Sequence, residues 1–116
     1  MAILIREWPF FLYICTTLKQ RKMFIISLNY KVSMNEVEKY LAAHVEYLKE
    51  QYAINNFIAS GRKVPRTGGI ILSNIKNREE LDTIINKDPF KQNRIADYDI
   101  IEFVPSMTSK ELDFLI

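Results

Sequence analysis

With 116 residues, of which 48% are apolar and 26% charged, the chain has the size and composition of one ordinary globular domain, and its three glycines and four prolines exclude a collagen-like or disordered class. The formal charge of +2 is unevenly distributed, because residues 23–116 hold 12 basic and 13 acidic side chains and the excess of positive charge lies in residues 1–22. This near-neutral balance argues against a nucleic-acid partner, which would need a strongly basic surface.

Residues 1–22 combine an apolar run at 8–15 with a basic cluster at 19–22. No small-residue cleavage site follows, which argues against a secretory signal. The 11 residues between Glu7 and Lys19 fall short of the ~20 that cross a bilayer, which argues against a membrane anchor. We therefore expect residues 1–22 to be an N-terminal extension upstream of a biological start at Met23. Peripheral membrane contact and a genuine structural element are the alternatives.

The domain itself is predicted over residues 23–105. Residues 23–30 are rich in β-branched and aromatic side chains, which is typical of a strand. Ser33 stands three residues before Glu36, a capping-box pattern that begins a helix. Apolar residues then recur at helical spacing and predict a helix over 34–53, with a stripe formed by Val37, Tyr40, Leu41, Val45, Leu48 and Tyr52.

A similar order follows in the second half of the chain. Residues 57–60 and 70–75 are predicted to be antiparallel strands, joined by a loop over 61–69 in which glycine and proline supply the bends. Asn77 and Glu80 repeat the capping pattern before a second helix, which ends before Pro89. Residues 98–104 form the last predicted strand, and the tail over 106–116 either folds back or docks on a partner.

The order β-α-β-β-α-β predicts an α+β fold of the ferredoxin-like type with a four-stranded antiparallel sheet. Right-handed crossovers place both helices on the same face of that sheet. The first and last strands carry apolar residues on both sides. In a sheet with one solvent-exposed face, apolar and polar residues would alternate along each strand. The open face measures about 350 Å², as large as the biggest apolar patch of a typical monomer. We therefore predict a homodimer that buries this face against a second copy, a dimeric α+β barrel.

Two ionisable residues are the candidates for catalysis. His44 lies on the apolar stripe of the first predicted helix, where it is either a hydrogen-bonded core residue or an imidazole that exchanges protons near neutral pH. Asp88 precedes Pro89, so it either punctuates the end of a helix or hydrogen-bonds the imidazole and fixes its tautomer. No spacing rule shows that the two side chains meet.

A second group of candidates follows the second predicted strand. Ser60 and Gly61 could orient a ligand and let backbone amides approach it, although both also suit a hairpin. Arg62, Lys63 and Arg66 could hold a carboxylate or phosphate, or could form a solvated loop.

Cysteine and histidine usage limits the cofactor chemistry. Cys15 and His44 are the only residues of their types, so an internal disulfide is excluded and a Cys/His zinc site lacks ligands. No phosphate loop, dinucleotide fingerprint or metal motif occurs. We therefore expect no metal and no cofactor, and the single cysteine fits a reducing, cytoplasmic location.

From residue 23 to about 105 the chain resembles the YciI-like family of small dimeric α+β-barrel proteins, which are related in shape to muconolactone isomerase. The resemblance lies in MFII at 23–26, His44, SGRK at 60–63, PRTGG at 65–69, DPF at 88–90 and YDIIEF at 98–103. It implies a site in which His44 and Asp88 face a pocket between sheet and helices, with Ser60 and Gly61 beside them.

Two departures from the family pattern concern the shape and charge of that pocket. Arg62 stands where many members have proline, and Asn93-Arg94 lacks the glycine that many members have nearby. The departures imply a more basic and differently shaped pocket in this chain.

Two functions from different classes remain open at this stage. The first is a cofactor-independent lyase or isomerase acting on a small anionic cyclic metabolite. In it His44 moves a proton, Asp88 orients the imidazole, and Arg62, Lys63 or Arg66 anchors the anion. The second is a non-catalytic dimeric module that binds a small ligand or another protein in the same cleft. RNA binding on the sheet is a distant third, because the first and third strands lack the aromatic and basic pairs that stack bases.

Overall fold

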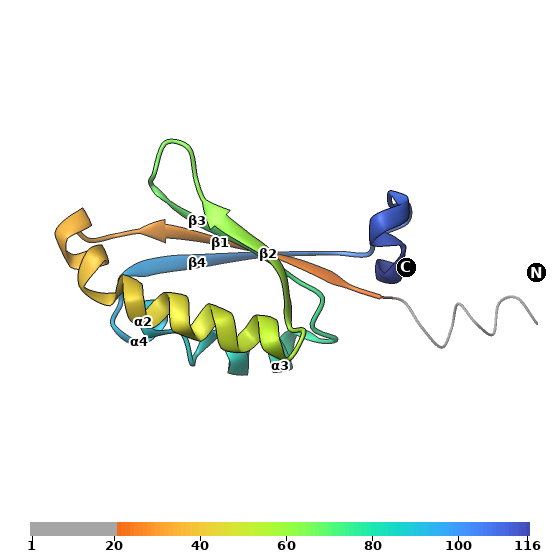
Figure 1. The fold of residues 1–116 in the computed structure, drawn as a ribbon, viewed down its shortest axis with the longest axis horizontal. Coiled ribbons are helices and arrows are strands. Elements are labelled where there is room, and N and C mark those ends of the chain that lie inside the picture. The colour runs from red at the N-terminus through yellow and green to blue at the C-terminus, as the bar shows by residue number, and fades with distance from the viewer. Residues whose placement is uncertain (1–20) are drawn as a thin grey trace, which may run out of the picture. The chain divides into compact units, whose positions relative to one another are not determined.

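The computed structural model describes residues 21–116, so the expectations for the first twenty residues lie outside it. Lys22–Phe103 form one compact unit, and residues 104–116 belong to a separate one. The first unit contains β1 (Met23–Tyr30), α2 (Met34–Ala53), β2 (Phe57–Arg62), β3 (Gly68–Ser73), α3 (Arg78–Ile85), α4 (Pro89–Gln92) and β4 (Ala96–Phe103) (Figure 1).

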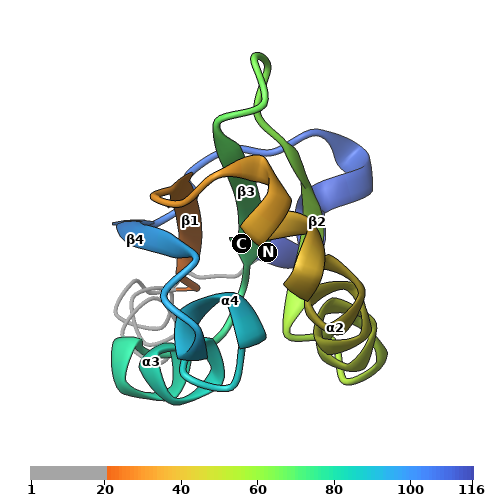
Figure 2. The same ribbon diagram turned by 90° about the vertical axis from the view of Figure 1, so that its left-hand side faces the viewer.

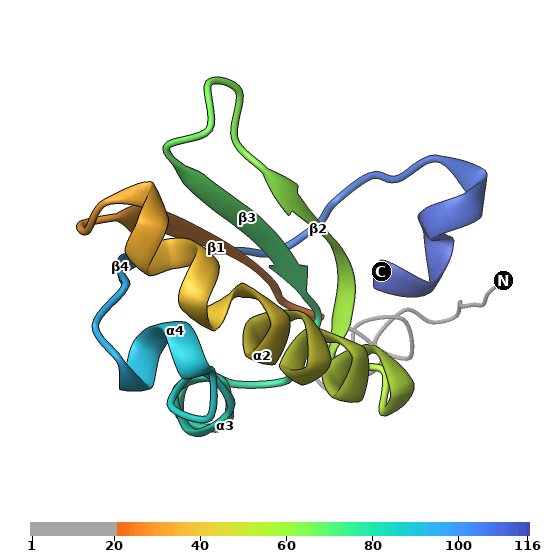
Figure 3. The same ribbon diagram turned by 60° about the vertical axis from the view of Figure 1, so that its left-hand side comes forward.

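The four strands form one antiparallel sheet in the order β2-β3-β1-β4. The helices α2 and α3 lie on the same side of this sheet, as Figures 2 and 3 show. The predicted α+β fold of the ferredoxin-like type is therefore confirmed. Its core lies between sheet and helices and is built around the buried side chains of Phe24, Ile26, Leu28, Val37, Ile71, Leu81, Ile85 and Phe90.

Both helix starts follow the predicted capping residues. The Ser33 hydroxyl accepts a hydrogen bond from the Glu36 amide, and the Asn77 side chain accepts one from the Glu80 amide. These bonds satisfy backbone donors that have no partner within the first turn of a helix. The first helix ends where predicted, and Asn55 adopts a φ of 63°, a conformation that asparagine tolerates better than most residues.

The hairpin between β2 and β3 is longer than predicted. Its strands run two residues further toward the loop on each side, to Arg62 and from Gly68. Gly68 and Gly69 make this possible, because a Cβ on Gly68 would lie 1.7 Å from the Leu28 carbonyl oxygen. Only glycine lets the start of β3 approach β1 so closely.

The buried stripe of α2 differs from the predicted one. Tyr47 and Gln51 are buried, whereas Val45, assigned to the stripe, is 38% exposed. Polar partners explain the difference, since Tyr47 donates to the Ile84 carbonyl at 2.8 Å and the Gln51 side chain accepts from Asn56 at 2.8 Å. These hydrogen bonds lower the free-energy cost of burying the two polar side chains. A pattern of apolar residues alone does not reveal such partners.

The sheet face opposite the helices is apolar near one end. Strand register places Ile25, Leu72 and Ile101 side by side on this face, and Phe103 shares it. Ile101 is 56% exposed and Phe103 is 42% exposed. Toward the other end the same face becomes polar, with Ser27 opposite Asp99 and Asn29 opposite Asp97.

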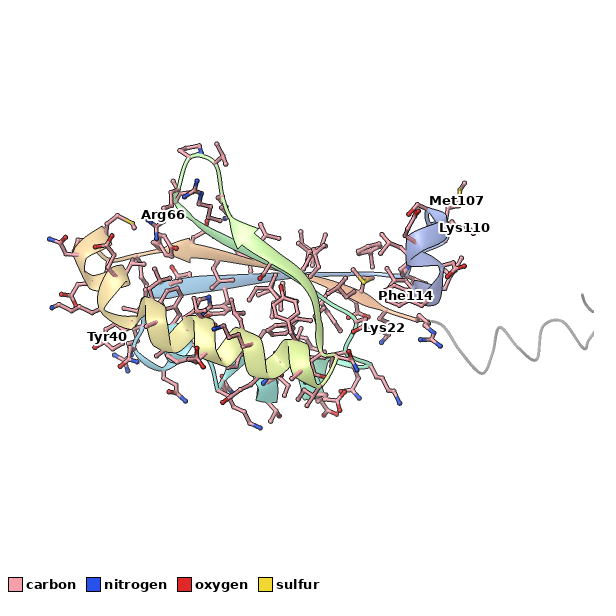
Figure 4. The ribbon with its side chains drawn as sticks, in the orientation of Figure 1. Lys22, Tyr40, Arg66, Met107, Lys110 and Phe114 are labelled. Atoms are coloured by element: carbon pink, nitrogen blue, oxygen red, sulfur yellow. The ribbon has the colours of Figure 1, made fainter. Side chains whose placement is uncertain are left out.

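Residues 104–116 contain one short element of their own, a 3₁₀ segment over Lys110–Leu115. Met107, Lys110 and Phe114 are marked on this part of the chain in Figure 4. Within the part of the chain that the structure describes, no helix has the length and apolar character needed to span a bilayer.

Candidate active site

His44 lies in the middle of α2 with its ring turned into the domain. Its side chain is 10% exposed, and its Nδ1 is 2.8 Å from Oδ1 of Asp88. The ring stacks on that of Phe90, with centroids 4.0 Å apart and an interplanar angle of 3°. The imidazole is therefore held by one hydrogen bond at its edge and by one aromatic ring on its face.

Asp88 is the point where several donors meet. It is the N-cap of α4, and its Oδ1 accepts the Phe90 amide at 2.9 Å as well as the contact from His44. Its Oδ2 accepts the Tyr98 hydroxyl at 2.6 Å. Both sequence interpretations of Asp88 thus describe its geometry, because one carboxylate caps a helix and also meets the imidazole.

The acceptor role of Asp88 decides how the imidazole protons are arranged. An ionised carboxylate only accepts hydrogen bonds, so a neutral His44 facing it carries its proton on Nδ1. The other ring nitrogen, Nε2, is then a free acceptor, and no residue within 21–116 hydrogen-bonds it. This is the arrangement that a histidine general base requires.

Two tyrosines beside the pair remain protonated donors. Burial, together with the nearby Asp88 carboxylate, raises the pKa of Tyr47 well above its usual 10. Burial and the same carboxylate, which also accepts its hydrogen bond, raise the pKa of Tyr98 further. Sequence reasoning missed both residues. Tyr47 stands one helical turn after His44, which could have indicated proximity, whereas Tyr98 is placed only by the register of β4 against β1.

A pocket of about 250 Å³ opens between the sheet and α2, with His44 in its wall. Most of the wall is apolar, with side chains from β1, α2, β3 and α4. Polar side chains in the wall, besides His44 and Tyr30, come from the β2–β3 hairpin, namely Ser60, Arg62 and Arg66, with Gly61 among them. A mostly apolar pocket with a few converging polar groups is the usual form of a small-molecule site.

The hairpin candidates therefore separate into two groups. Ser60, Gly61, Arg62 and Arg66 line the pocket, and Figure 4 shows Arg66 on the loop joining β2 and β3. Lys63 does not line it, because its Nζ donates to Oδ1 of Asn29 at 2.7 Å. Lys63 follows the last residue of β2, and its side chain is directed to β1 by this hydrogen bond.

Ser60 has a partner that orients its hydroxyl. The Tyr52 hydroxyl lies 2.6 Å from Ser60 Oγ, and either oxygen can be the donor. The serine oxygen is thereby held at the pocket wall. Within residues 21–116 no cluster of three or more His, Cys, Asp or Glu side chains is arranged to hold a metal ion.

Fold and site together define a small ferredoxin-like α+β domain with a buried His–Asp pair at an apolar pocket. The chain belongs to the family of the YCII-related domain, whose model matches residues 21–104. No curated protein sequence is a significant match.

Two of the solved structures that resemble the chain illustrate the likeness. One is the 5-chloro-2-hydroxyhydroquinone dehydrochlorinase of Burkholderia phenoliruptrix, in complex with 2,5-dihydroxybenzoquinone. It is 18% identical, with a TM-score of 0.60, and the match covers 74% of this chain and 95% of the dehydrochlorinase. The other is a mutant of SnoaB, a cofactor-independent oxygenase of Streptomyces nogalater, at 9% identity and a TM-score of 0.46, covering 79% of this chain and 99% of the oxygenase. The first likeness supports the fold.

Proposed function

We propose that this protein is a cofactor-independent lyase or isomerase that acts on a small anionic cyclic metabolite. The observation that supports it best is the 2.8 Å contact between His44 and Asp88 in the wall of an apolar pocket. Buried polar pairs are costly unless fully hydrogen-bonded, and a structural role alone does not require that one of them border a cavity.

In this proposal the proton moves through Nε2 of His44. The neutral imidazole takes a proton from the bound ring, and Asp88 stabilises the imidazolium through Nδ1–H. The imidazolium then returns the proton, to another ring position in an isomerase or to the departing group in a lyase. Acid–base assistance of this kind accelerates a reaction by about 10²–10⁴.

Charge and shape of the pocket suggest the substrate class. Arg62 and Arg66 line the pocket end formed by the hairpin and would pair with a carboxylate or phenolate, the guanidinium through two parallel hydrogen bonds. Ser60, held by Tyr52, would orient an oxygen of the same ring. The dehydrochlorinase of similar fold binds 2,5-dihydroxybenzoquinone, which is also a small oxygenated ring. Hydroxylated benzoquinones and cyclic carboxylates are therefore the first compounds to test.

Metabolite profiling tests this function with a matched pair of variants. Small-molecule extracts are incubated with wild-type protein, with His44→Asn and with Glu79→Gln, and profiled by mass spectrometry. Asparagine keeps a donor near the position of Nδ1 for Asp88 but has no counterpart of Nε2, whereas Glu79 is exposed on α3. We expect a substrate to be consumed by wild type and Glu79→Gln, and at least about 100-fold more slowly by His44→Asn.

Two outcomes of this experiment contradict an enzyme. Either the three profiles are identical to that of extract alone, or His44→Asn turns over as fast as wild type. A compound that is retained by the protein without being converted would favour the non-catalytic binding module instead. Thermal unfolding of each variant separates lost chemistry from lost folding.

We also propose that the open sheet face is buried in a homodimer and that the protein is cytoplasmic. Ile101 and Phe103 lie exposed on this face, next to Ile25 and Leu72 of the neighbouring strands. Light scattering at micromolar concentration should give twice the mass of one chain for wild type. Ile101→Glu should give a single chain, because burying an unpaired charge is costly. A monomeric wild type would contradict the proposal.

A further inference from the structure

We propose that Tyr98 is a positioning residue of the site, whose hydroxyl fixes the plane of the Asp88 carboxylate and thereby the tautomer of His44. The inference rests on the proposed function of the His44–Asp88 pair. It assigns a role to a residue of β4 that lies outside the pocket wall.

The geometry distributes three donors over two carboxylate oxygens. Oδ1 of Asp88 receives both His44 Nδ1 and the Phe90 amide, while Oδ2 receives the Tyr98 hydroxyl at 2.6 Å. The last contact is the only one that residues 21–116 make to Oδ2. Without it, rotation about the Cβ–Cγ bond of Asp88 would be opposed only by contacts to the other oxygen. Tyr98 therefore helps to fix the plane in which the Asp88 carboxylate faces the imidazole.

Tyr98 is itself held from several sides. Its side chain packs against the core cluster, and Nζ of Lys91 lies over the ring at 5.3 Å from its centroid. Tyr98 is also among the residues that line a polar hollow, together with residues of β1, α4, β4 and the segments that flank them. Asp88, to which the Tyr98 hydroxyl donates, is 1% exposed. Burial keeps the phenol a donor, since it raises the pKa of Tyr98 above its usual range.

A consequence for the imidazole follows from this arrangement. An Asp88 oxygen held against Nδ1 favours the tautomer with its proton on Nδ1, which leaves Nε2 free toward the pocket. A carboxylate that can rotate away from Nδ1 favours this tautomer less strongly. Because a hydrogen bond to a charged group changes an equilibrium by about tenfold or more, loss of the Tyr98 hydroxyl should be visible in the tautomer ratio.

The test uses the fact that His44 is the only histidine of the chain. The full-length protein is labelled with ¹⁵N-histidine, so its spectrum contains one pair of imidazole nitrogens. Spectra are recorded near pH 9, where an imidazole is neutral and a phenol still protonated. Tyr98→Phe removes the hydroxyl and keeps the ring. Tyr47→Phe is the matched control, because Tyr47 also stands beside the pair but donates to the Ile84 carbonyl.

We expect Tyr98→Phe to raise the ratio of Nε2–H to Nδ1–H tautomer by about tenfold, and Tyr47→Phe to change it less than about twofold. An unchanged or lower ratio in Tyr98→Phe, or an equal change in both variants, would overturn the inference. As a check that does not depend on the folding of Tyr98→Phe, 3-fluorotyrosine placed at position 98 keeps the ring and a stronger donor, and it is compared with wild type closer to neutral pH because the fluorine lowers the pKa of the phenol. It should retain the wild-type ratio, and a rise there would also count against the proposal.

This result is separable from the fate of the proposed function. If His44→Asn abolishes turnover but Tyr98→Phe leaves the tautomers unchanged, only the positioning role is wrong. If no metabolite is converted but the tautomers respond as expected, Tyr98 orients the pair and the catalytic proposal fails alone.

Discussion

Replacing Asp88 by alanine removes the acceptor of three hydrogen bonds at once. The Phe90 amide and His44 Nδ1 are buried, so each is left without a partner at a cost of about 1–3 kcal/mol. Tyr98 is only half-buried, so the loss of its acceptor adds less than the other two losses. The free energy of unfolding should therefore fall by about 2–6 kcal/mol, a large part of the roughly 5–15 kcal/mol that stabilises a typical domain.

Asp88→Asn is the matched variant for this measurement. Its oxygen can still accept from the Phe90 amide and His44, and its NH₂ can donate to the oxygen of Tyr98. We expect it to cost about 1 kcal/mol or less. Urea unfolding followed by circular dichroism at one fixed protein concentration gives both values. If Asp88→Ala lies within about 0.5 kcal/mol of wild type, the three contacts do not hold the site together and the reasoning is refuted.

Two further predictions concern the hairpin and the tyrosines. Gly68→Ala should prevent stable folding, because its Cβ would fall on the Leu28 carbonyl oxygen. Gly61→Ala is the control and should fold normally, because its Cβ meets nothing within 4 Å. Similar melting temperatures for the two variants would contradict this prediction. The raised pKa values of Tyr47 and Tyr98 mean that the unfolded chain loses these protons first, so the free energy of unfolding should fall as the pH rises above about 10. Tyr98→Phe should make this fall shallower by about 1.4 kcal/mol per pH unit, and unfolding curves with equal pH slopes would count against it.

Local signals in the sequence were sufficient for most of the fold. Ser33 and Asn77 cap their helices as their spacing predicts, because a capping bond involves residues only three positions apart. The order of the elements, with right-handed crossovers, then determined the layers. The short helix α4 was missed, since a four-residue helix has no periodicity and depends on Asp88 as its N-cap.

The site could be predicted only in part, because its contacts join distant segments. Sequence indicated His44 and Asp88 separately, but they are 44 positions apart and only the folded chain shows their contact. Tyr98 gave no signal, and Tyr47 gave only its spacing of one helical turn from His44, since an aromatic residue in a strand or helix is ordinarily a packing residue. Lys63 was grouped with Arg62 and Arg66 by charge, whereas its Nζ hydrogen-bonds Asn29, a partner 34 positions away that the local sequence does not reveal.

The ¹⁵N spectrum of wild-type His44 is the measurement that bears most directly on the catalytic proposal. If Asp88 accepts from Nδ1, the neutral imidazole should be almost entirely the Nδ1–H tautomer, with the chemical shift of an unprotonated nitrogen at Nε2. A predominant Nε2–H tautomer would mean that no bare nitrogen is available to take a proton from a ligand, and it would contradict the account.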